Sequence, residues 1–362
     1  MKGKTSRFDK AREMMEKSGV DCLIVPPSSN LLYLTGYRGF MMERPAFLML
    51  FMEQALYVAP SFELPALEAY VGEAVREIPW EEAENPYEKA RQAAGNRKIR
   101  AAIDFSAPVF LYYGLKNYFS DWEWYTDTDI LQDMRCCKDP EETALIARAQ
   151  ELSSDAFRRL MGHGIGKMTE LQTAELLKQY LEEEGLEASL PIVAAGKNGA
   201  SPHHGAGDYV IQKGDAVVID FGGAYGGYHS DITRTLAVSR ASEQFREIYH
   251  IVKKANLEAK EAIRPGITCG CADRAARKVI EDAGYGGFFT HRLGHGIGLD
   301  IHEQPYLVEN NERILKAGNV FSDEPGIYLP GKFGIRIEDL LAVSENGAKM
   351  LGNLSKDLEI VD

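Results

Sequence analysis

Two acidic pairs, each set in apolar segments on either side of a turn-forming stretch, constrain the fold of this chain more than any other feature. The pairs are Asp220 with Asp231, and Glu324 with Glu338. If each pair faces across a β-hairpin, one turn falls at Tyr225-Gly226 and the other at Pro330-Gly331-Lys332. Facing carboxylates on neighbouring strands lie only about 4.5–5.5 Å apart and repel each other. A fold with both hairpins therefore needs a source of positive charge.

The neighbours of these acids indicate burial. Asp220 ends the run Val-Val-Ile-Asp, and Glu338 ends Ile-Arg-Ile-Glu. Burying an unpaired carboxylate costs several kcal/mol, so divalent cations held between the strands are the economical explanation. The structural alternative is salt bridging, with Arg234 close to Asp231 and Arg336 close to Glu338 in the sequence.

A glycine-rich segment supplies nitrogen donors. It contains three of the eight histidines, His291, His295 and His302. Neither a helical nor a strand period requires histidine at these positions, so their grouping favours a functional site. Carboxylates with one imidazole make a fairly hard site that suits Mn²⁺ and also binds Co²⁺ or Zn²⁺.

The length of 362 residues predicts two domains. Helical and strand patterns alternate along the first part, which predicts a small α/β domain over residues 1–135. Its expected elements are a helix over 8–17, a strand over 22–25 and a strand pair within 47–58. The boundary falls within 127–139, and residues 136–362 form the second domain. The fold class is α/β, of the α+β kind.

The second domain is predicted to alternate helices with hairpins. Two capping boxes start its first helices, Asp139 with Glu142 and Thr169 with Gln172. The first helix runs to about Leu160, and the second stops at Gly185. Further helices are expected over 243–263 and 270–283, and strands over 216–221, 228–238, 319–323 and 333–343.

Composition excludes several classes of protein. The formal net charge of -13 argues against a nucleic-acid binder, which needs a basic face. The longest apolar stretch, 46–52, is far shorter than the ~20 residues of a membrane helix. The first 19 residues carry charges throughout and lack the apolar core of a signal peptide. Together with the five cysteines, read as reduced thiols, this predicts a cytoplasmic protein without membrane or nucleic-acid partners.

Five short motifs, in this order, resemble the signatures of the Xaa-Pro peptidases, the family of prolidase and aminopeptidase P. They are Val218-Ile-Asp220-Phe-Gly, Ser230-Asp231-Ile-Thr-Arg-Thr, Gly294-His295-Gly-Ile-Gly, Glu324-Pro-Gly-Ile-Tyr and Arg336-Ile-Glu338-Asp. The resemblance spans about 140–350. It implies a pita-bread catalytic domain over 136–362, preceded by a creatinase/prolidase-like N-terminal domain over 1–135.

The resemblance also implies a dinuclear metal site. Asp220 and Asp231 would serve one metal and His295 and Glu324 the other, with Asp231 and Glu338 shared between them. A water activated by the two cations would attack the scissile carbonyl. Glu324 would accept its proton.

Histidines outside the ligand set are implied at the substrate site. Either His203 or His204 fills the place of a family histidine upstream of the first metal aspartate. His302 resembles the histidine that stabilises the tetrahedral intermediate, and His291 resembles one that lines the same pocket.

Two charged residues stand beside the ligands. Arg336 either orients Glu338 or meets a substrate carboxylate, and orientation is the default expectation. Asp323 precedes Glu324 where relatives more often carry an apolar residue. Neighbouring residues of a strand point to opposite faces, so we do not expect Asp323 to be a ligand.

The leading function is metal-dependent hydrolysis of the Xaa-Pro bond in dipeptides, or as an aminopeptidase on longer peptides. A methionine aminopeptidase usually lacks a large N-terminal domain, and creatinase does without the metal ligands. A metal-dependent hydrolase of a small non-peptide substrate is the enzyme alternative. A non-catalytic peptide-binding homologue would have lost ligands, and none of the five is missing. The family resemblance suggests a homodimer.

Overall fold

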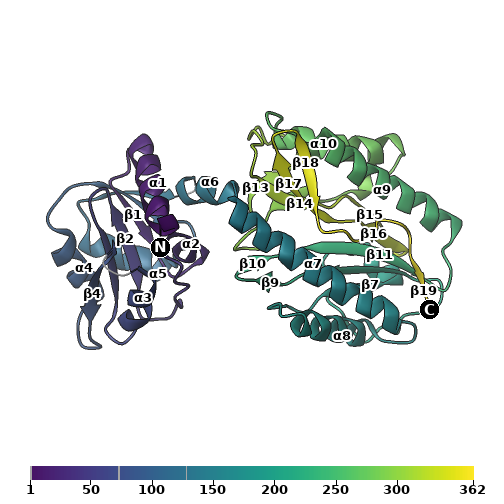
Figure 1. Cartoon of the computed structure of the whole chain (residues 1–362), viewed down its shortest axis with the longest axis horizontal. Helices are drawn as coiled ribbons and strands as arrows, with labels where there is room; N and C mark the ends of the chain where they lie inside the picture. Colours follow the sequence, from purple (N-terminus) through teal and green to yellow (C-terminus); the bar gives the residue numbers. More distant parts are fainter. Residues whose placement is uncertain (1, 72–73, 128) are drawn as a thin grey trace. The chain divides into compact units, whose positions relative to one another are not determined.

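The computed structural model describes residues 2–71, 74–127 and 129–362. The chain divides into two compact units, Met1–Arg135 and Cys136–Asp362, which are described separately (Figure 1). In the described ranges, no helix combines the length and apolar character that crossing a membrane requires.

The first unit is built around a six-stranded mixed sheet in the order β4-β3-β2-β1-β5-β6. Its strands are β1 Cys22–Val25, β2 Phe47–Phe51, β3 Ala55–Pro60, β4 Arg76–Trp80, β5 Arg100–Asp104 and β6 Glu123–Asp127. Its helices are α1 Lys2–Ser18, α2 Ser29–Thr35, α3 Leu64–Val71, α4 Pro86–Ala94, α5 Val109–Tyr118 and α6 Ile130–Cys136. The predicted strand at 22–25 and the strand pair are confirmed, with Phe47 opposite Val58. The helix predicted over 8–17 lies within the longer α1.

The second unit contains two larger sheets and two hairpins. The four-stranded sheet has the order β19-β11-β8-β7, and the five-stranded sheet has the order β13-β12-β14-β17-β18. The strands are β7 Ile192–Ala195, β8 Ala216–Phe221, β9 Ala224–Tyr225, β10 Tyr228–His229, β11 Ile232–Val238, β12 Gly294–Gly296, β13 Glu303–Leu307, β14 Val320–Asp323, β15 Gly326–Leu329, β16 Phe333–Arg336, β17 Asp339–Ser344, β18 Gly347–Leu351 and β19 Ile360–Val361. The two-stranded pairs are β9 with β10 and β15 with β16.

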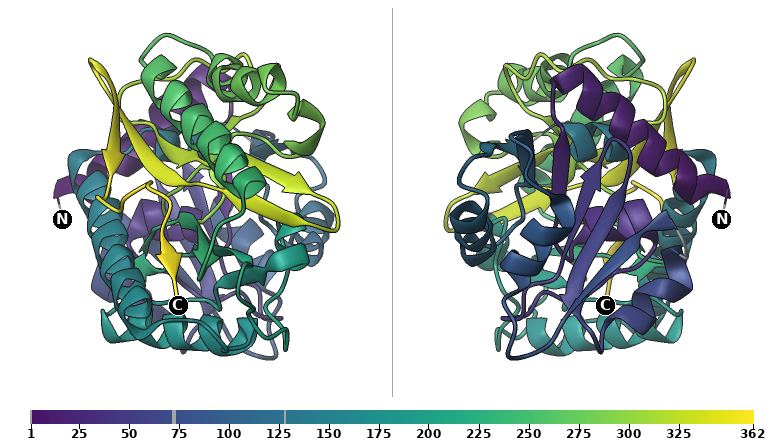
Figure 2. Two further views of the ribbon diagram at one scale, coloured as in Figure 1. Left: turned by 90° about the vertical axis from the view of Figure 1, so that its right-hand side faces the viewer. Right: turned by 90° about the vertical axis from the view of Figure 1, so that its left-hand side faces the viewer.

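Two helix pairs cover these sheets (Figures 1 and 2). They are α7 Pro140–His163 with α8 Glu170–Glu183, and α9 Glu243–Ala262 with α10 Cys269–Asp282; the short 3-10 helices are η2 Gly196–Ala200 and η3 Gly286–Phe288. The first pair shares a hydrophobic core with β7, β8 and β11, in which Phe157 stacks on Phe221 at 5.0 Å between ring centroids. The second pair shares a core with β14 to β17. A helix pair thus packs on one face of each sheet, and the other face is turned toward the interior of the unit.

The helix starts follow the predicted capping chemistry. The side chain of Asp139 accepts from the backbone N–H of Glu142, whose carboxylate accepts from the N–H of Asp139. Thr169 and Gln172 form the same reciprocal pair at the start of α8. Both predicted capping boxes are confirmed.

The first hairpin has a different register from the predicted one. Asp220 lies opposite Thr233, and Ala224 lies opposite His229, so Asp220 does not face Asp231. The turn is Gly226-Gly227, with φ of 57° and 85°. A two-residue turn with positive φ at both central positions suits the twist of a hairpin, and glycine adopts it without strain. The prediction that placed Tyr225 in the turn was wrong for this reason.

The second hairpin has the predicted register. Leu329 lies opposite Phe333, which leaves the three-residue turn 330–332. Further from the turn, Asp323 lies opposite Asp339 in the same register. Glu324 and Glu338 stand between these two ladders and therefore fall opposite each other.

Three of the acids interrupt the strands that carry them. Asp231 lies between β10 and β11, Glu324 between β14 and β15, and Glu338 between β16 and β17. The strands predicted over 228–238 and 333–343 are therefore each broken in two. At one break the backbone N–H of Glu338 donates to the carbonyl of Thr233 at 3.0 Å. This contact joins the two hairpins and brings their acids together.

Candidate metal centre and active site

The break between the hairpins gathers a set of metal-binding side chains. One ligand atom from each of Asp231, His295 and Glu338 lies within 4.8 Å of the others. Nε2 of His295 lies 3.6 Å from Oδ2 of Asp231 and 3.3 Å from Oε1 of Glu324. Residues more than a hundred positions apart thus converge on a single point.

A cavity of about 340 Å³ opens onto this point. It is lined by Pro202, His203, Asp220, Asp231, His291, Arg292, His295, His302, Glu324, Arg336 and Glu338. All five residues expected as metal ligands line it. So do His203, His291, His302 and Arg336, the residues expected at the substrate.

Burial and mutual repulsion dominate the electrostatics of the acids. Burial, with the charges of Asp220 and Glu324, raises the pKa of Asp231 well above its usual value. Burial and the charge of Asp231 do the same to the pKa of Glu338, and burial raises the pKa of Glu324 to about 7. Oε1 of Glu338 has no hydrogen-bond partner within the described part of the chain. An oxygen-rich cluster with an unsatisfied carboxylate atom fits divalent cations.

His295 is prepared as a neutral nitrogen donor. Burial lowers the pKa of His295 to about 3, so the ring carries no charge near neutral pH. Its Nδ1 lies 3.1 Å from the carbonyl oxygen of Gly296, to which it donates in the matching tautomer. The lone pair is then on Nε2, the atom that faces Asp231 and Glu324.

Two hydroxyls hold the acids in place, and sequence reasoning missed both. Oγ1 of Thr233 donates to Oε2 of Glu338 at 2.6 Å. Oγ of Ser322 donates to Oε1 of Glu324 at 3.0 Å and accepts from the backbone N–H of His295. Each hydroxyl lies two residues from an acid of the cluster, a spacing that places both on the same face of a strand. That spacing is the signal that could have identified them.

Arg336 contacts a different acid from the expected one. Its Nη2 lies 2.6 Å from Oδ2 of Asp220, and its Nε donates to Oγ1 of Thr233 at 3.0 Å. It therefore reaches Glu338 only through Thr233. The salt-bridge alternative also placed Arg234 with Asp231, but Arg234 pairs with Asp339 at 2.7 Å.

The two histidines upstream of Asp220 have different surroundings. His203 lines the cavity. Nε2 of His204 instead lies 3.0 Å from Oε2 of Glu170, whose side chain is fully buried. The other oxygen of Glu170 accepts from the N–H of Ala195 and the side chain of Asn198. Glu170 thus holds the segment that carries His203, a contact that sequence reasoning missed.

His291 and His302 lie at the edge of the cluster. Nε2 of His291 lies 2.8 Å from the hydroxyl oxygen of Tyr328. The same hydroxyl oxygen accepts a hydrogen bond from Nη1 of Arg336 at 2.9 Å. Burial lowers the pKa of His291 to about 4. The ring of His302 lies 4.0 Å from that of His295. Tyr328, the last residue of the motif that begins at Glu324, is a further residue that sequence reasoning missed.

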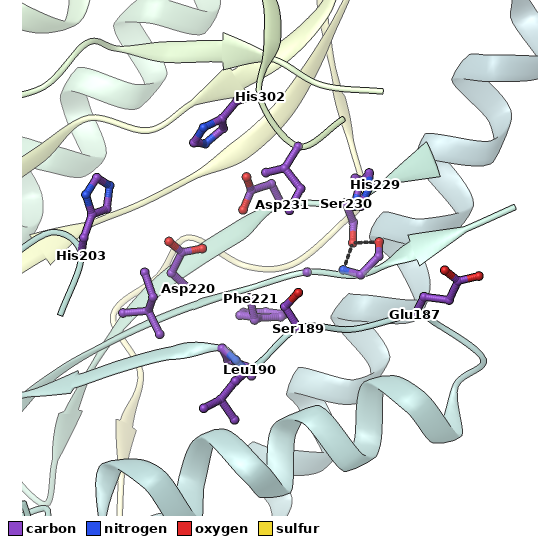
Figure 3. A pocket seen from close by; sticks show the side chains of 15 residues that line it. Glu187, Ser189, Leu190, His203, Asp220, Phe221, His229, Ser230, Asp231 and His302 are labelled. Carbon is purple, nitrogen blue, oxygen red and sulfur yellow. Dashed lines mark hydrogen bonds between the residues drawn. The ribbon is translucent and has the colours of Figure 1, made fainter. Parts of the chain in front are cut away.

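A second cavity of about 240 Å³ adjoins the first (Figure 3). The two share His203, Asp220, Asp231 and His302. The other lining residues are Glu187, Ser189, Leu190, Pro191, Ile192, Phe221, Gly222, Gly223, His229, Ser230 and Ile301. Asp323 lines neither cavity.

Comparison with known proteins gives concordant matches for both units. Residues 144–345 match the model of metallopeptidase family M24, and residues 7–137 match the Creatinase/Prolidase N-terminal domain.

Relatives match over nearly the whole chain. An Xaa-Pro dipeptidase of Pyrococcus horikoshii is 34% identical over 97% of this chain and 98% of its own. The crystal structure of dipeptidase PepE from Mycobacterium ulcerans has a TM-score of 0.94 and 36% identity, covering 99% of this chain and 98% of that one. An X-Pro aminopeptidase from Thermotoga maritima has a TM-score of 0.84 and 32% identity, covering 96% of this chain and 100% of that one.

Proposed function

Because the chain belongs to metallopeptidase family M24, we propose that it hydrolyses the peptide bond before proline, in dipeptides or at the amino end of longer peptides. The observation that carries the proposal is the convergence of Asp231, His295 and Glu338 on one point beside a cavity that peptide-sized groups can enter. Relatives named as Xaa-Pro dipeptidases and as an X-Pro aminopeptidase support the bond specificity.

Two divalent cations are proposed at the cluster. Asp220 and Asp231 would hold one, His295 and Glu324 the other, with Asp231 and Glu338 shared. The raised pKa values of Asp231 and Glu338 support this, because such acids ionise together only beside positive charge. Bound cations supply Lewis acidity, which acidifies water and polarises a carbonyl group. The mixed carboxylate and imidazole set favours Mn²⁺, with Co²⁺ and Zn²⁺ also accommodated.

Glu324 is the proposed proton acceptor. Its Oε1 is fixed by the hydroxyl of Ser322. A carboxylate held beside the attacking water can take its proton and later return it to the leaving nitrogen. His203 and His302 are proposed to donate hydrogen bonds to the substrate. His291 is proposed to line the same pocket, because its two ring nitrogens already contact the carbonyl of Arg292 and the hydroxyl of Tyr328. Arg336 holds Asp220 and Thr233 in position.

The remaining parts of the proposal concern the whole protein. Residues 136–362 would form the catalytic domain and residues 1–135 an accessory domain. The protein would be cytoplasmic, and it would act as a homodimer, as the family resemblance suggests. A hydrolase of a small non-peptide substrate on the same fold is the second candidate.

The test is release of amino acids from Ala-Pro, Ala-Pro-Ala and Met-Ala-Ser by metal-stripped protein, with and without added Mn²⁺. Metal-dependent cleavage of Ala-Pro alone would indicate a dipeptidase, and cleavage of Ala-Pro-Ala as well an aminopeptidase. The Glu324→Gln variant at saturating Mn²⁺ should turn over at least ~100-fold more slowly, because it loses both the proton acceptor and a proposed metal ligand. No cleavage of a proline peptide despite metal binding would contradict the proposal.

A further inference from the structure

Part of the lining of the second cavity is apolar. Leu190, Ile301 and Phe221 line it, and Leu190 and Ile301 are 47% and 43% exposed. Exposed aliphatic side chains that line a cavity next to a catalytic cluster are available to contact a ligand. The wall therefore suits a hydrocarbon chain.

One charged residue stands apart from the metal cluster in this cavity. Glu187 is exposed, and the described structure gives its carboxylate neither a hydrogen bond nor an ion pair. Its backbone is fixed, since its N–H donates to the carbonyl of Ala224 and its own carbonyl accepts from the N–H of Ala224. No lysine or arginine lines the cavity. The backbone of Glu187 is thus held in place, and its carboxylate has no partner among the described residues.

Glu187 lies at one side of the cavity. Figure 3 shows His203 and Asp220 toward the other side, with Asp231 and Leu190 between. A ligand that extends from Asp231 past Leu190 and pairs with Glu187 is apolar in its middle and positively charged at its tip. The side chains of lysine and arginine have this form.

The charges of the two cavities also set the direction of the substrate. Arg292 lines the first cavity and suits the carboxyl side of a peptide, whereas Glu187 is the carboxylate that the second cavity adds to those of the shared residues. With the scissile bond at the shared residues, the residue before the bond falls in the second cavity.

Resting on the proposed function, we propose that the second cavity receives the side chain of the residue before the scissile bond and that Glu187 selects lysine or arginine there. The aliphatic stem lies along Leu190 and Ile301, and the cationic group meets the carboxylate of Glu187. An exposed ion pair of this kind gives a preference of about three- to fivefold over an uncharged chain of equal length.

The experiment compares kcat/KM for Lys-Pro, Arg-Pro, norleucine-Pro and Glu-Pro with the Mn²⁺-loaded protein. Norleucine matches lysine in length without the charge. The variants are Glu187→Gln and Glu187→Lys. The matched control is Glu182→Gln, which changes the net charge equally at an exposed position outside both cavities.

The wild type and the control should favour Lys-Pro over norleucine-Pro about three- to fivefold. Glu187→Gln should bring that ratio close to one while leaving norleucine-Pro unchanged, and Glu187→Lys should favour Glu-Pro. An unchanged ratio in Glu187→Gln would overturn the inference. An equal loss of kcat/KM on every substrate in Glu187→Gln would also overturn the inference, because Glu187 would then bind the α-amino group that all the substrates share. Failure of the wild type to cleave norleucine-Pro or Ala-Pro would instead overturn the proposed function itself.

Discussion

Thr233 and Glu338 are joined by a hydrogen bond of 2.6 Å from Oγ1 to Oε2. The same hydroxyl accepts from Nε of Arg336. A single neutral group thus links the guanidinium to the carboxylate. Oε1 of Glu338, the atom left without a partner in the described structure, is the one free to bind a cation.

Replacing Thr233 by valine should weaken metal binding. The change removes the donor to Glu338, and partners that orient a ligand contribute about 10- to 100-fold to metal affinity. It should also lower the free energy of unfolding by about 1–3 kcal/mol, because buried polar groups lose a partner. Calorimetric titration with Mn²⁺ measures the first effect and urea unfolding the second.

The matched control is Thr235→Val on the same strand. Its hydroxyl contacts only the backbone of Arg336. Stability should fall in a similar way, but Mn²⁺ affinity should stay within about twofold of the wild type, since no ligand loses its donor. Equal losses of affinity in the two variants would show that Thr233 acts only through general stability.

The metal-free protein should lose stability as the pH rises above about 6.5. Burial raises the folded pKa of Glu324 to about 7 and also raises the pKa values of Asp231 and Glu338, so all three bind protons more tightly in the folded state. The stability that they contribute is fully present below their unfolded pKa values and is lost as the pH passes their folded ones. The lowered pKa values of His291 and His295 act in the opposite sense, but only below 6.5, their ordinary value.

Urea unfolding at about pH 6.5 and about pH 8, with and without Mn²⁺, measures this dependence. Saturating Mn²⁺ should reduce the loss, because the cations stabilise the ionised acids. The raised pKa of Asp323, which arises from burial outside the cavities, should leave a residual loss in both conditions. Metal-free protein that is as stable at the higher pH would refute the repulsion between the acids.

Arg336→Met should destabilise the metal-free protein more than the metal-loaded one. Without cations, Arg336 is the arginine that pairs with Asp220, and removing one partner of a buried pair costs about 3–5 kcal/mol. Bound cations take over part of that role. Lys138→Met is the control, since Lys138 pairs with Glu303 at 2.6 Å and neither residue lines the cavity, so its loss should be equal in both conditions. If Arg336→Met lowered the free energy of unfolding equally with and without Mn²⁺, the prediction would be contradicted.

Glu170→Gln should lower kcat/KM about tenfold while leaving Mn²⁺ affinity unchanged. The amide oxygen can replace only one carboxylate oxygen, so either His204 and the N–H of Gly207, or the N–H of Ala195 and the side chain of Asn198, lose their acceptor. The segment carrying His203 is then less well held, and small displacements of substrate-positioning groups reduce rates strongly. Steady-state kinetics on Ala-Pro measures the effect.

Glu175→Gln, an exposed substitution on the same helix, is the control and should match the wild type. Glu170→Asp retains both acceptors and should recover part of the activity. If Glu170→Gln weakened Mn²⁺ binding as much as it weakened catalysis, Glu170 would support the whole domain rather than the position of His203.

Local patterns in the sequence predicted the parts of the fold that local interactions determine. The capping boxes at Asp139 and Thr169 depend on residues three positions apart, and both are present. The register of the hairpin around Gly331 follows from its turn and is also correct. The predicted turn of the other hairpin was wrong by one residue. Gly226 and Gly227 both adopt positive φ, which a tyrosine in the turn would oppose.

Contacts between distant parts of the chain could not be predicted in this way. Arg336 and Asp220 are separated by 116 positions, so no spacing rule relates them. The motifs identified the residues around the cavity but not which of them touch. Glu187 belongs to no motif, and only the packing of its segment beside Ala224 places it at a cavity.

The turn at 330–332 can change in length without moving the acids of its hairpin. The pairing of β14 with β17 and that of β15 with β16 have the same register. Either pairing alone would place Glu324 opposite Glu338. Gly331 has a φ of 74°, and an added Cβ there would meet no atom within 4 Å. An inserted reporter peptide can therefore be accommodated at Gly331 while the acid cluster stays intact.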